Sequence, residues 1–189
     1  MNVKSVIESE TTYTELMIPA YANFSGKVHG GILLSIMDKV AYVCASKHSG
    51  SYVVTVSVEG VEFLSPVEVG DLITVKASLI YAGRSSMIVG MRTESFNPRT
   101  GENRHTNSCY FSMVAKNDDG TLRSVPGLLL KNKTELIRFC EGKWLKEQAR
   151  VKRDTLKSDI FGISIEEMHS MVSGENCRID STLSEDQTA

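Results

Sequence analysis

The sequence predicts an α+β protein in which a curved antiparallel sheet wraps around one central helix, with a second helix after the sheet. Residues 30–47 carry apolar side chains at the spacing of a buried helix. Residues 54–115 instead alternate apolar and polar side chains, as strands do, and turn signals interrupt them. Because one helix cannot cover both faces of a sheet, a sheet curved around it is the economical solution, and the outer face then needs a partner.

Length and composition limit the class of protein. The chain has 189 residues, which suits one domain with an appendage, and its 41% hydrophobic and 23% charged residues are ordinary for a globular protein. The formal net charge of -2 gives no sign of nucleic-acid binding. The start of the chain has no long apolar stretch and does not resemble a signal peptide, and the apolar region 32–45 is too short and too polar to cross a bilayer.

The cysteines and histidines indicate neither a disulfide framework nor a metal site. The four cysteines form no Cys-x-x-Cys pair, which favours a reducing cytoplasm, and Cys44 and Cys109 lie in apolar runs as small core residues. The remaining histidines away from the central segment have no metal-ligand spacing; they are His48, His105 and His169.

The first third of the chain predicts one short strand and the central helix. Residues 1–12 are polar and are expected to be irregular at the start, residues 13–18 predict a strand that Pro19 stops, and residues 21–29 read as a loop. The helix over 30–47 is apolar around most of its circumference, so other structure should surround it. Ser49 and Gly50 end it.

Four strands follow. Each is predicted by period-two alternation, and the connections contain Pro, Gly, Asn or Asp, with two tight enough for antiparallel neighbours. The alternating apolar positions are Val54, Val56 and Val58; Ile73, Val75, Ala77 and Leu79; Met87, Val89 and Met91; and Cys109, Phe111, Met113 and Ala115.

The last third predicts a basic helix and an acidic tail. Residues 131–153 read as a helix that Asn132 caps with Glu135 three positions on. Its apolar stripe, which consists of Leu136, Ile137, Cys140 and Trp144, is expected to pack against the domain; docking of an anionic ligand or surface on its basic residues is the alternative. Residues 154–189 are acidic, with a short helix within 160–171 and disorder over the last fifteen or so.

The segment from Asn23 to Asp38 carries the chemistry. A carboxylate in an otherwise apolar helix must face a cavity, a partner or a subunit interface, because an unpaired buried charge is costly. Gly30 and Gly31 at the helix start would let backbone N–H groups approach a ligand closely, where the helix end carries partial positive charge. One such donor to an oxyanion is worth roughly 2.7–4 kcal/mol in a hydrolase.

The spacing places the carboxylate near those amides. Asp38 follows Gly30 by a little over two helical turns, so it would lie on roughly the same side and could act as a base or nucleophile. The same residues also fit a plain turn before a helix that carries a solvated Asp, and spacing alone does not separate the two interpretations.

A family resemblance favours the catalytic interpretation. Asn23, Gly26, His29-Gly30-Gly31 and Asp38 together resemble the Asn-x-x-Gly-x-x-His-Gly-Gly motif and helical Asp of hotdog-fold thioesterases. Residues 54–71, the Gly83-Arg84-Ser85-Ser86 turn and the run from Tyr110 to Ala115 resemble the acyl-CoA hydrolase branch that includes YciA-type and cytosolic acyl-CoA thioesterases. The resemblance covers roughly residues 8–125, and the combination is specific whereas the glycine pair alone is not.

The resemblance implies hydrolysis of acyl-CoA to free acid and CoA. Asp38 would be general base or nucleophile, and Asn23 would position water or substrate from the other subunit of a dimer. The Gly30 N–H, with that of Gly31, would polarise the thioester carbonyl. His29 would support the loop or form a hydrogen bond near the thioester. Without the family, Asn23 reads as a loop-capping residue.

The resemblance also implies how substrate binds and how the chain assembles. Gly83, Arg84 and Ser85 would lie near the CoA nucleotide, with phosphate contact by Arg84. No metal and no cofactor is expected, since CoA belongs to the substrate. The expected domains are the thioesterase domain 8–125, the basic helical extension 126–153 and the tail 154–189. A homodimer is the minimum, and a hexamer of three dimers is expected.

Two other functions share this fold. A non-catalytic acyl-CoA sensor would bind without turnover, and a fused DNA-binding segment would be expected beside it. Dehydratases or hydratases would act on the acyl chain and leave the thioester intact. Release of free thiol distinguishes a thioesterase from both. No GxSxG sequence supports a serine hydrolase.

Overall fold

The computed structural model describes residues 2–155 and 162–179. The chain divides into two compact units, Met1–Lys143 and Trp144–Ala189. The elements in chain order are β1 (Val3–Ser5), η1 (Val6–Glu8), β2 (Thr11–Leu16), η2 (Pro19–Tyr21), α1 (Gly30–Ser49), β3 (Tyr52–Glu59), β4 (Leu72–Ala82), β5 (Ser86–Phe96), β6 (Asn103–Lys116), β7 (Gly127–Leu129), α2 (Lys133–Thr155) and α3 (Ile165–Val172).

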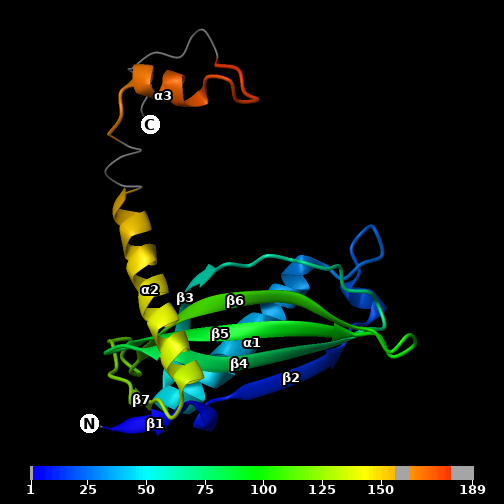
Figure 1. The fold of residues 1–189 in the computed structure, drawn as a ribbon, viewed down its shortest axis with the longest axis vertical. Coiled ribbons are helices and arrows are strands. Elements are labelled where there is room, and N and C mark those ends of the chain that lie inside the picture. Colours follow the sequence, from blue (N-terminus) through cyan, green and yellow to red (C-terminus); the bar gives the residue numbers. More distant parts are fainter. Residues whose placement is uncertain (1, 156–161, 180–189) are drawn as a thin grey trace. The chain divides into compact units, whose positions relative to one another are not determined.

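Five of the strands form one curved antiparallel sheet in the order β2-β4-β5-β6-β3 (Figure 1). The strand that follows α1 pairs with the last long strand, so β2 and β3 are the two edges. The predicted architecture of a curved antiparallel sheet around one helix is confirmed, although β4, β5 and β6 extend beyond the alternating segments that predicted them.

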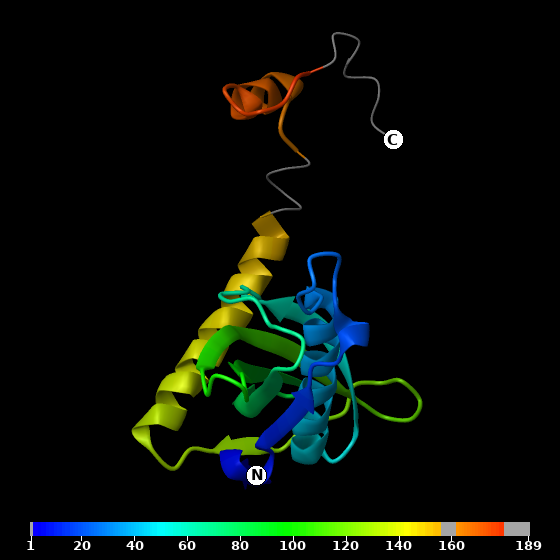
Figure 2. The same cartoon turned by 90° about the vertical axis from the view of Figure 1, so that its right-hand side faces the viewer.

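The core lies between α1 and the concave face of the sheet. Figure 2 shows α1 on one side of the sheet and the beginning of α2 on the other. The alternating positions of β4, β5 and β6 that predicted strands are all buried, and Cys44 and Cys109 are buried as expected. Gly50, with φ of 64°, ends α1 in the left-handed conformation that glycine adopts at low cost.

The chain is regular from Val3 on, contrary to the prediction for residues 1–12. β1 pairs in parallel with β7, and a 3-10 turn follows it. The Lys4 ammonium donates to the carbonyls of Lys47 and His48, at 2.9 and 2.8 Å. Those carbonyls lie at the end of α1, where a cation is stabilised by the helix dipole. The partner strand is over 120 residues away, so local sequence carried no sign of the pairing.

β3 departs from simple alternation. Val53 is buried, whereas Val56 and Val58 are exposed, at 57% and 40%. A register shift between Thr55 and Ser57 interrupts the pairing with β6 and changes which residues face the core. The result is an edge strand with exposed apolar side chains, and no strand among the described residues pairs with its outer side.

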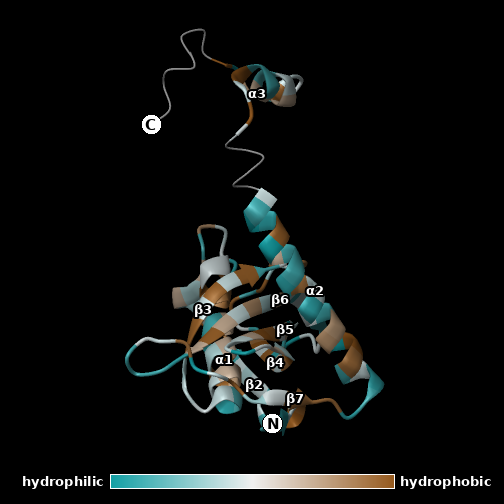
Figure 3. Ribbon diagram, turned by 90° about the vertical axis from the view of Figure 1, so that its left-hand side faces the viewer, coloured by the Kyte–Doolittle hydropathy of each residue, from teal (hydrophilic) through white to brown (hydrophobic). Residues whose placement is uncertain are grey.

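α2 begins as predicted but packs with a different face. Asn132 Oδ1 accepts from the Glu135 amide at 2.9 Å, which confirms the cap. The contact with the sheet is made by Phe139, whose ring lies 5.1 Å from that of Tyr81, and by the buried Gly142. The predicted packing stripe is wrong: its large apolar side chains are exposed, and Figure 3 shows apolar residues interrupting the hydrophilic surface of α2. They are Leu136, Ile137 and Trp144.

The tail holds a short helix near the predicted place. α3 begins after Ser164, whose side chain accepts from the Glu167 amide while Glu167 reaches back to the Ser164 amide. Residues 156–161 and 180–189 lie outside the described residues, so the predicted disorder of the last fifteen residues stays a prediction over most of its length.

Candidate active site

The start of α1 presents one free amide. His29 is the N-cap residue, and its Nδ1 accepts from the Gly31 N–H at 2.9 Å. The Gly30 N–H, one of the amides that a helix leaves unpaired, donates to no acceptor within residues 2–155 and 162–179. A Cβ on Gly30 would come within 3.3 Å of the Phe63 ring, so the glycine allows that ring to lie against the helix start. His29 therefore orients Gly31 and leaves Gly30 as the available donor.

Asp38 lies on the exposed face of α1 and is held by a strand residue. The Thr55 hydroxyl donates to Asp38 Oδ1 at 2.6 Å, and its oxygen also lies 3.4 Å from the Met113 sulfur. Since Asp38 follows Gly31 by close to two turns of about 3.6 residues each, both lie on one side of the helix. One carboxylate oxygen is thus engaged, and no hydrogen bond from residues 2–155 or 162–179 occupies the other.

The surface around Asp38 is apolar. Tyr42 and Val43 of α1 are each 41% exposed, and Tyr42 stacks obliquely on Tyr52 of β3 with ring centroids 6.3 Å apart. Val58 lies along the same edge of the sheet, on the strand whose outer side is unpaired. Exposed apolar patches beside an unpaired strand edge are typical of subunit interfaces. In an assembly the carboxylate would therefore lie at a boundary between subunits.

Asn23 shapes its own loop. Its Oδ1 accepts from the amides of Ser25 and Lys27, at 2.9 and 3.1 Å, and from the Ser25 hydroxyl at 2.7 Å. Gly26, with φ of 78°, supplies the turn that closes the loop. Because all three partners are donors, the oxygen must face inward and the Nδ2 donors face away. The loop-capping interpretation of Asn23 is thus correct, and it leaves an N–H donor for a ligand.

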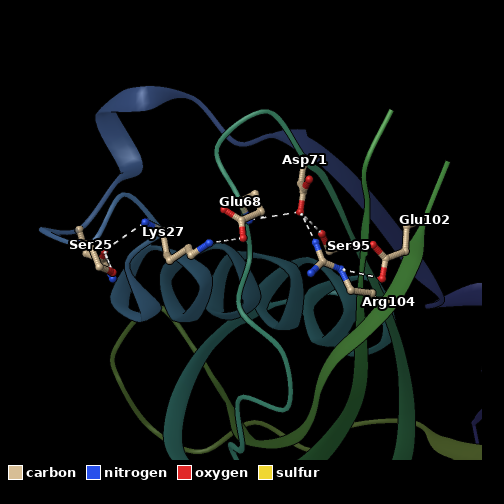
Figure 4. A network of polar contacts seen from close by, with 8 residues as sticks. Ser25, Lys27, Glu68, Asp71, Ser95, Glu102 and Arg104 are labelled. Carbon is tan, nitrogen blue, oxygen red and sulfur yellow. Dashed lines mark hydrogen bonds and ion pairs between the residues drawn. The ribbon is translucent and has the colours of Figure 1, made fainter. Parts of the chain in front are cut away.

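A series of polar contacts connects residues 23–27, which we call the Asn23 loop, to the sheet (Figure 4). Lys27 forms an ion pair with Glu68, and the Glu68 amide donates to Asp71 Oδ2 at 3.2 Å. Asp71 is fully buried and also accepts from the Ser95 hydroxyl at 2.6 Å and from Arg104 at 3.3 Å. Arg104 is therefore an internal partner of a buried carboxylate.

The predicted CoA contacts lie at the other end of the sheet. Gly83, Arg84 and Ser85 form the β4–β5 hairpin, which is pinned by the amides of Ala115 and Val125 donating to the carbonyls of Ser85 and Arg84, both at 2.9 Å. The Arg84 side chain is exposed. The start of α1 lies at the opposite end, beside Phe63. There the amide of the next residue, Leu64, donates to the Thr106 carbonyl. One chain alone does not bring the hairpin to Gly30.

Sequence reasoning missed Thr55. It is a polar residue in an alternating strand, where a solvent-facing Thr is ordinary, and only the packing of β3 against α1 brings it to Asp38. Among residues 2–155 and 162–179, no three His, Cys, Asp or Glu side chains lie together in a way that could hold a metal ion. Within the same residues, no helix is both long and apolar enough to cross a lipid bilayer.

Comparison with known proteins gives consistent relatives. Residues 25–102 match the thioesterase superfamily. Protein VdlD of Helicobacter pylori is 43% identical over 143 residues, which are 76% of this chain and 80% of VdlD. A crystal structure of an apo-hexameric acyl-CoA thioesterase is 33% identical, with a TM-score of 0.77 over 82% of this chain and 99% of that one. An acyl-CoA hydrolase of Staphylococcus aureus, solved with butyryl coenzyme A and coenzyme A, is 29% identical with a TM-score of 0.76 over 84% of this chain and 96% of that one.

The Staphylococcus aureus hydrolase has also been solved as three alanine variants, at an Asn, an Asp and a Thr. In that protein the Asn precedes the Asp by 15 residues and the Thr follows the Asp by 17. Asn23, Asp38 and Thr55 have the same two spacings in this chain.

Proposed function

The chain belongs to the thioesterase superfamily, and on this premise we propose that it hydrolyses acyl-CoA thioesters to a free acid and CoA at a site built around Asp38. The observation that carries the proposal is the carboxylate of Asp38, which accepts from the Thr55 hydroxyl and lies on the same side of α1 as Gly31. The acyl-CoA hydrolases among its relatives support the substrate class.

Asp38 supplies the proton acceptor for the reaction. With Oδ1 held by Thr55, Oδ2 accepts a proton from water as the water oxygen bonds to the thioester carbon. Collapse of the tetrahedral intermediate breaks the carbon–sulfur bond, and the proton passes to the departing thiolate. Direct attack by the same oxygen, followed by hydrolysis of a mixed anhydride, uses the same geometry.

Gly30 and Asn23 supply the donors. The unpaired Gly30 N–H at the positive end of α1 stabilises the negative charge that develops on the carbonyl oxygen. The Nδ2 of Asn23, contributed by the other subunit of the dimer, donates to substrate or to the attacking water, since the side-chain oxygen is occupied within the loop. Gly31 and His29 support the site without contacting the substrate, because the hydrogen bond between them fixes the loop before α1.

The site is completed by a second copy of the chain. The unpaired edge of β3, with exposed Val58 and the adjacent Tyr42 and Val43, is the surface that a partner would cover. An isologous dimer that pairs the two β3 edges antiparallel reverses one sheet relative to the other. The partner's Arg84 hairpin then lies at the end where α1 of this chain begins. Three such dimers would form the hexamer that is named for three of the solved relatives.

The test is release of free thiol from CoA esters of increasing chain length, with identification of the acid product. Asp38→Asn keeps the shape of the side chain and removes the acceptor, so kcat should fall by at least about a hundredfold, the lower range for loss of a general base. Melting temperature should remain close to the wild-type value, because Asp38 is exposed in the chain. Turnover by Asp38→Asn at the wild-type rate would reject the role of Asp38.

The same assay separates the alternatives. Binding of acyl-CoA by the wild-type protein without thiol release would favour a sensor. A change in the acyl chain with the thioester intact would favour a dehydratase or hydratase. No contact within the described residues favours either alternative over hydrolysis.

A further inference from the structure

Resting on the proposed function, we propose that Lys27 and Glu68 are positioning residues for the reaction. Their ion pair attaches the Asn23 loop to a buried anchor at Asp71, and so determines where the Asn23 amide group lies relative to the reacting thioester. Neither side chain needs to touch the substrate for this role.

The Asn23 loop fixes its own shape but not its place. The Asn23 amide donates to the Lys27 carbonyl at 2.6 Å, the Gly26 amide donates to the Asn23 carbonyl at 3.0 Å, and the side chain of Asn23 accepts from amides of the same loop. Phe24 at the tip is fully exposed. All of these bonds would survive if the loop moved as a unit, so its position depends on contacts to the rest of the molecule.

Lys27 is the residue at which those contacts meet. Its backbone N–H donates to Asn23 Oδ1 at 3.1 Å, and its ammonium pairs with the Glu68 carboxylate. Lys27 and Glu68 are also partners in an isolated β-bridge, and the next amide along, that of Val28, donates to the Val67 carbonyl at 2.9 Å. Backbone and side chain therefore attach the loop to the same segment.

The segment that receives the loop is itself anchored in the core. The Glu68 amide donates to Asp71 Oδ2, and the Asp71 amide donates to the Glu68 carbonyl, both at 3.2 Å. Asp71 is fully buried between Ser95 of β5 and Arg104 of β6. A buried carboxylate held by two strands has little freedom to move, so it provides a fixed reference for the loop (Figure 4).

The ion pair is suited to positioning rather than to stability. The side chains of Lys27 and Glu68 are 42% and 33% exposed, and exposed pairs contribute little to folding. A misplacement of about 1 Å at a catalytic group can nevertheless cost as much as a hundredfold in rate. Loss of the pair should thus be visible in turnover while the fold is retained.

The experiment compares Lys27→Met and Glu68→Gln with a matched control, Lys76→Met. Lys76 pairs with Glu94 on the outer face of the sheet at 2.6 Å and is similarly exposed, at 54%, but has no contact with the Asn23 loop. For Lys27→Met and Glu68→Gln, kcat for thiol release should fall about tenfold with KM changed less than about twofold, as expected for a transition-state contact. Lys76→Met should retain the wild-type kcat, and Lys27→Arg, which keeps the charge, should recover most of it.

A double-mutant cycle identifies the residue through which Lys27 acts. If Lys27 positions Asn23, Lys27→Met should add nothing to the loss caused by Asn23→Ala, because the group being positioned is absent. Additive losses, or a Lys27→Met kcat equal to that of the Lys76→Met control, would overturn the inference. If Lys27→Met lowers the melting temperature sharply, Glu68→Gln carries the same comparison. Wild-type protein that releases no thiol would instead contradict the proposed function, which is a separate result.

Discussion

At the scale of single residues, the site depends on which atom of each side chain is already engaged. Asn23 uses its oxygen to close its own loop and keeps its N–H donors, whereas Asp38 uses one oxygen for Thr55 and keeps the other. Gly31 is bonded to His29 and Gly30 is not. In the proposed site, these pairings would leave one acceptor and two donors for the substrate, which is what hydrolysis of a thioester needs.

Thr55→Val tests the contact to Asp38. The change keeps the branched shape and removes the hydroxyl that donates to the carboxylate at 2.6 Å. A hydrogen bond to a charged group contributes about 1.5–3 kcal/mol, so kcat should fall at least about tenfold. Thiol release at saturating substrate measures it, with thermal unfolding to verify the fold. A kcat within twofold of wild type would show that Thr55 does not orient Asp38.

His48 makes the stability of the folded protein depend on pH. It is fully buried at the end of α1, and its Nε2 donates to the Pro126 carbonyl at 2.9 Å. Burial lowers its pKa below the ordinary value, and the nearby Lys4 adds to this, against the opposing influence of Pro126 and Glu8. The unfolded chain therefore takes up the proton more readily, so stability is complete above pH about 6.5 and decreases as pH falls from there toward the lower native pKa.

The measurement is melting temperature between pH 7.5 and 5.5. Wild-type protein should lose more of its melting temperature over this range than His48→Gln, which keeps an N–H donor for Pro126 but does not titrate. Parallel curves for the two proteins would show that another group is responsible.

At the scale of elements, α2 is positioned by a glycine rather than by its apolar stripe. A Cβ on Gly142 would lie 2.6 Å from Tyr81 Cβ, closer than such atoms approach, and 3.2 Å from Ile80 Cγ1, which is a tight contact. The backbone of α2 therefore packs directly against the sheet at Gly142. Next to this contact, the Phe139 ring packs on the Tyr81 ring. This close approach explains why Leu136 and Trp144, which look like the natural packing residues, remain outside.

Gly142→Ala tests this packing. In an exposed helix the change would stabilise by about 1 kcal/mol, because alanine is the better helix former. Here the added methyl group forces α2 away from the sheet, and overpacking of this kind costs about 1–3 kcal/mol. Urea unfolding should show a lower midpoint than wild type, while Cys140→Ala at an exposed position of the same helix should leave it nearly unchanged. A raised midpoint for Gly142→Ala would contradict the close approach.

At the scale of the whole molecule, the two edges of the sheet have different surroundings. The β2 edge is remote from Asp38, whereas the β3 edge carries Thr55 and adjoins the exposed apolar face of α1. Dimerisation through β3 would enclose the carboxylate and add a partner's hairpin to each site. The predicted hexamer, the cytoplasmic location and the domain boundaries stay predictions.

Val58→Glu tests the assembly. A charge at the β3 edge should dissociate the dimer, because burying it unpaired in an interface is unfavourable. Sedimentation velocity should show a smaller species, and thiol release should fall with it. Leu16→Glu is the matched control, since Leu16 is an exposed apolar residue on the β2 edge. Loss of assembly in the control but not in Val58→Glu would place the interface on the other edge.

The sequence by itself determined the elements that local patterns specify. Apolar spacing identified α1, period-two alternation identified β4, β5 and β6, and Asn132 with Glu135 marked the start of α2, because each signal involves residues a few positions apart. The sequence also indicated Asn23, Gly30 and Asp38 as candidate site residues, and their roles stay predictions.

Only the tertiary structure decided which distant residues meet. Thr55 reaches Asp38 through the packing of β3 on α1, β1 pairs with β7 across most of the domain, and Lys27 pairs with Glu68 across 41 residues. The face of α2 that packs was decided by how closely Gly142 approaches Tyr81. The physical reason is the same in each case: these contacts depend on shape and distance between separate elements, which the periodicity of one segment does not contain.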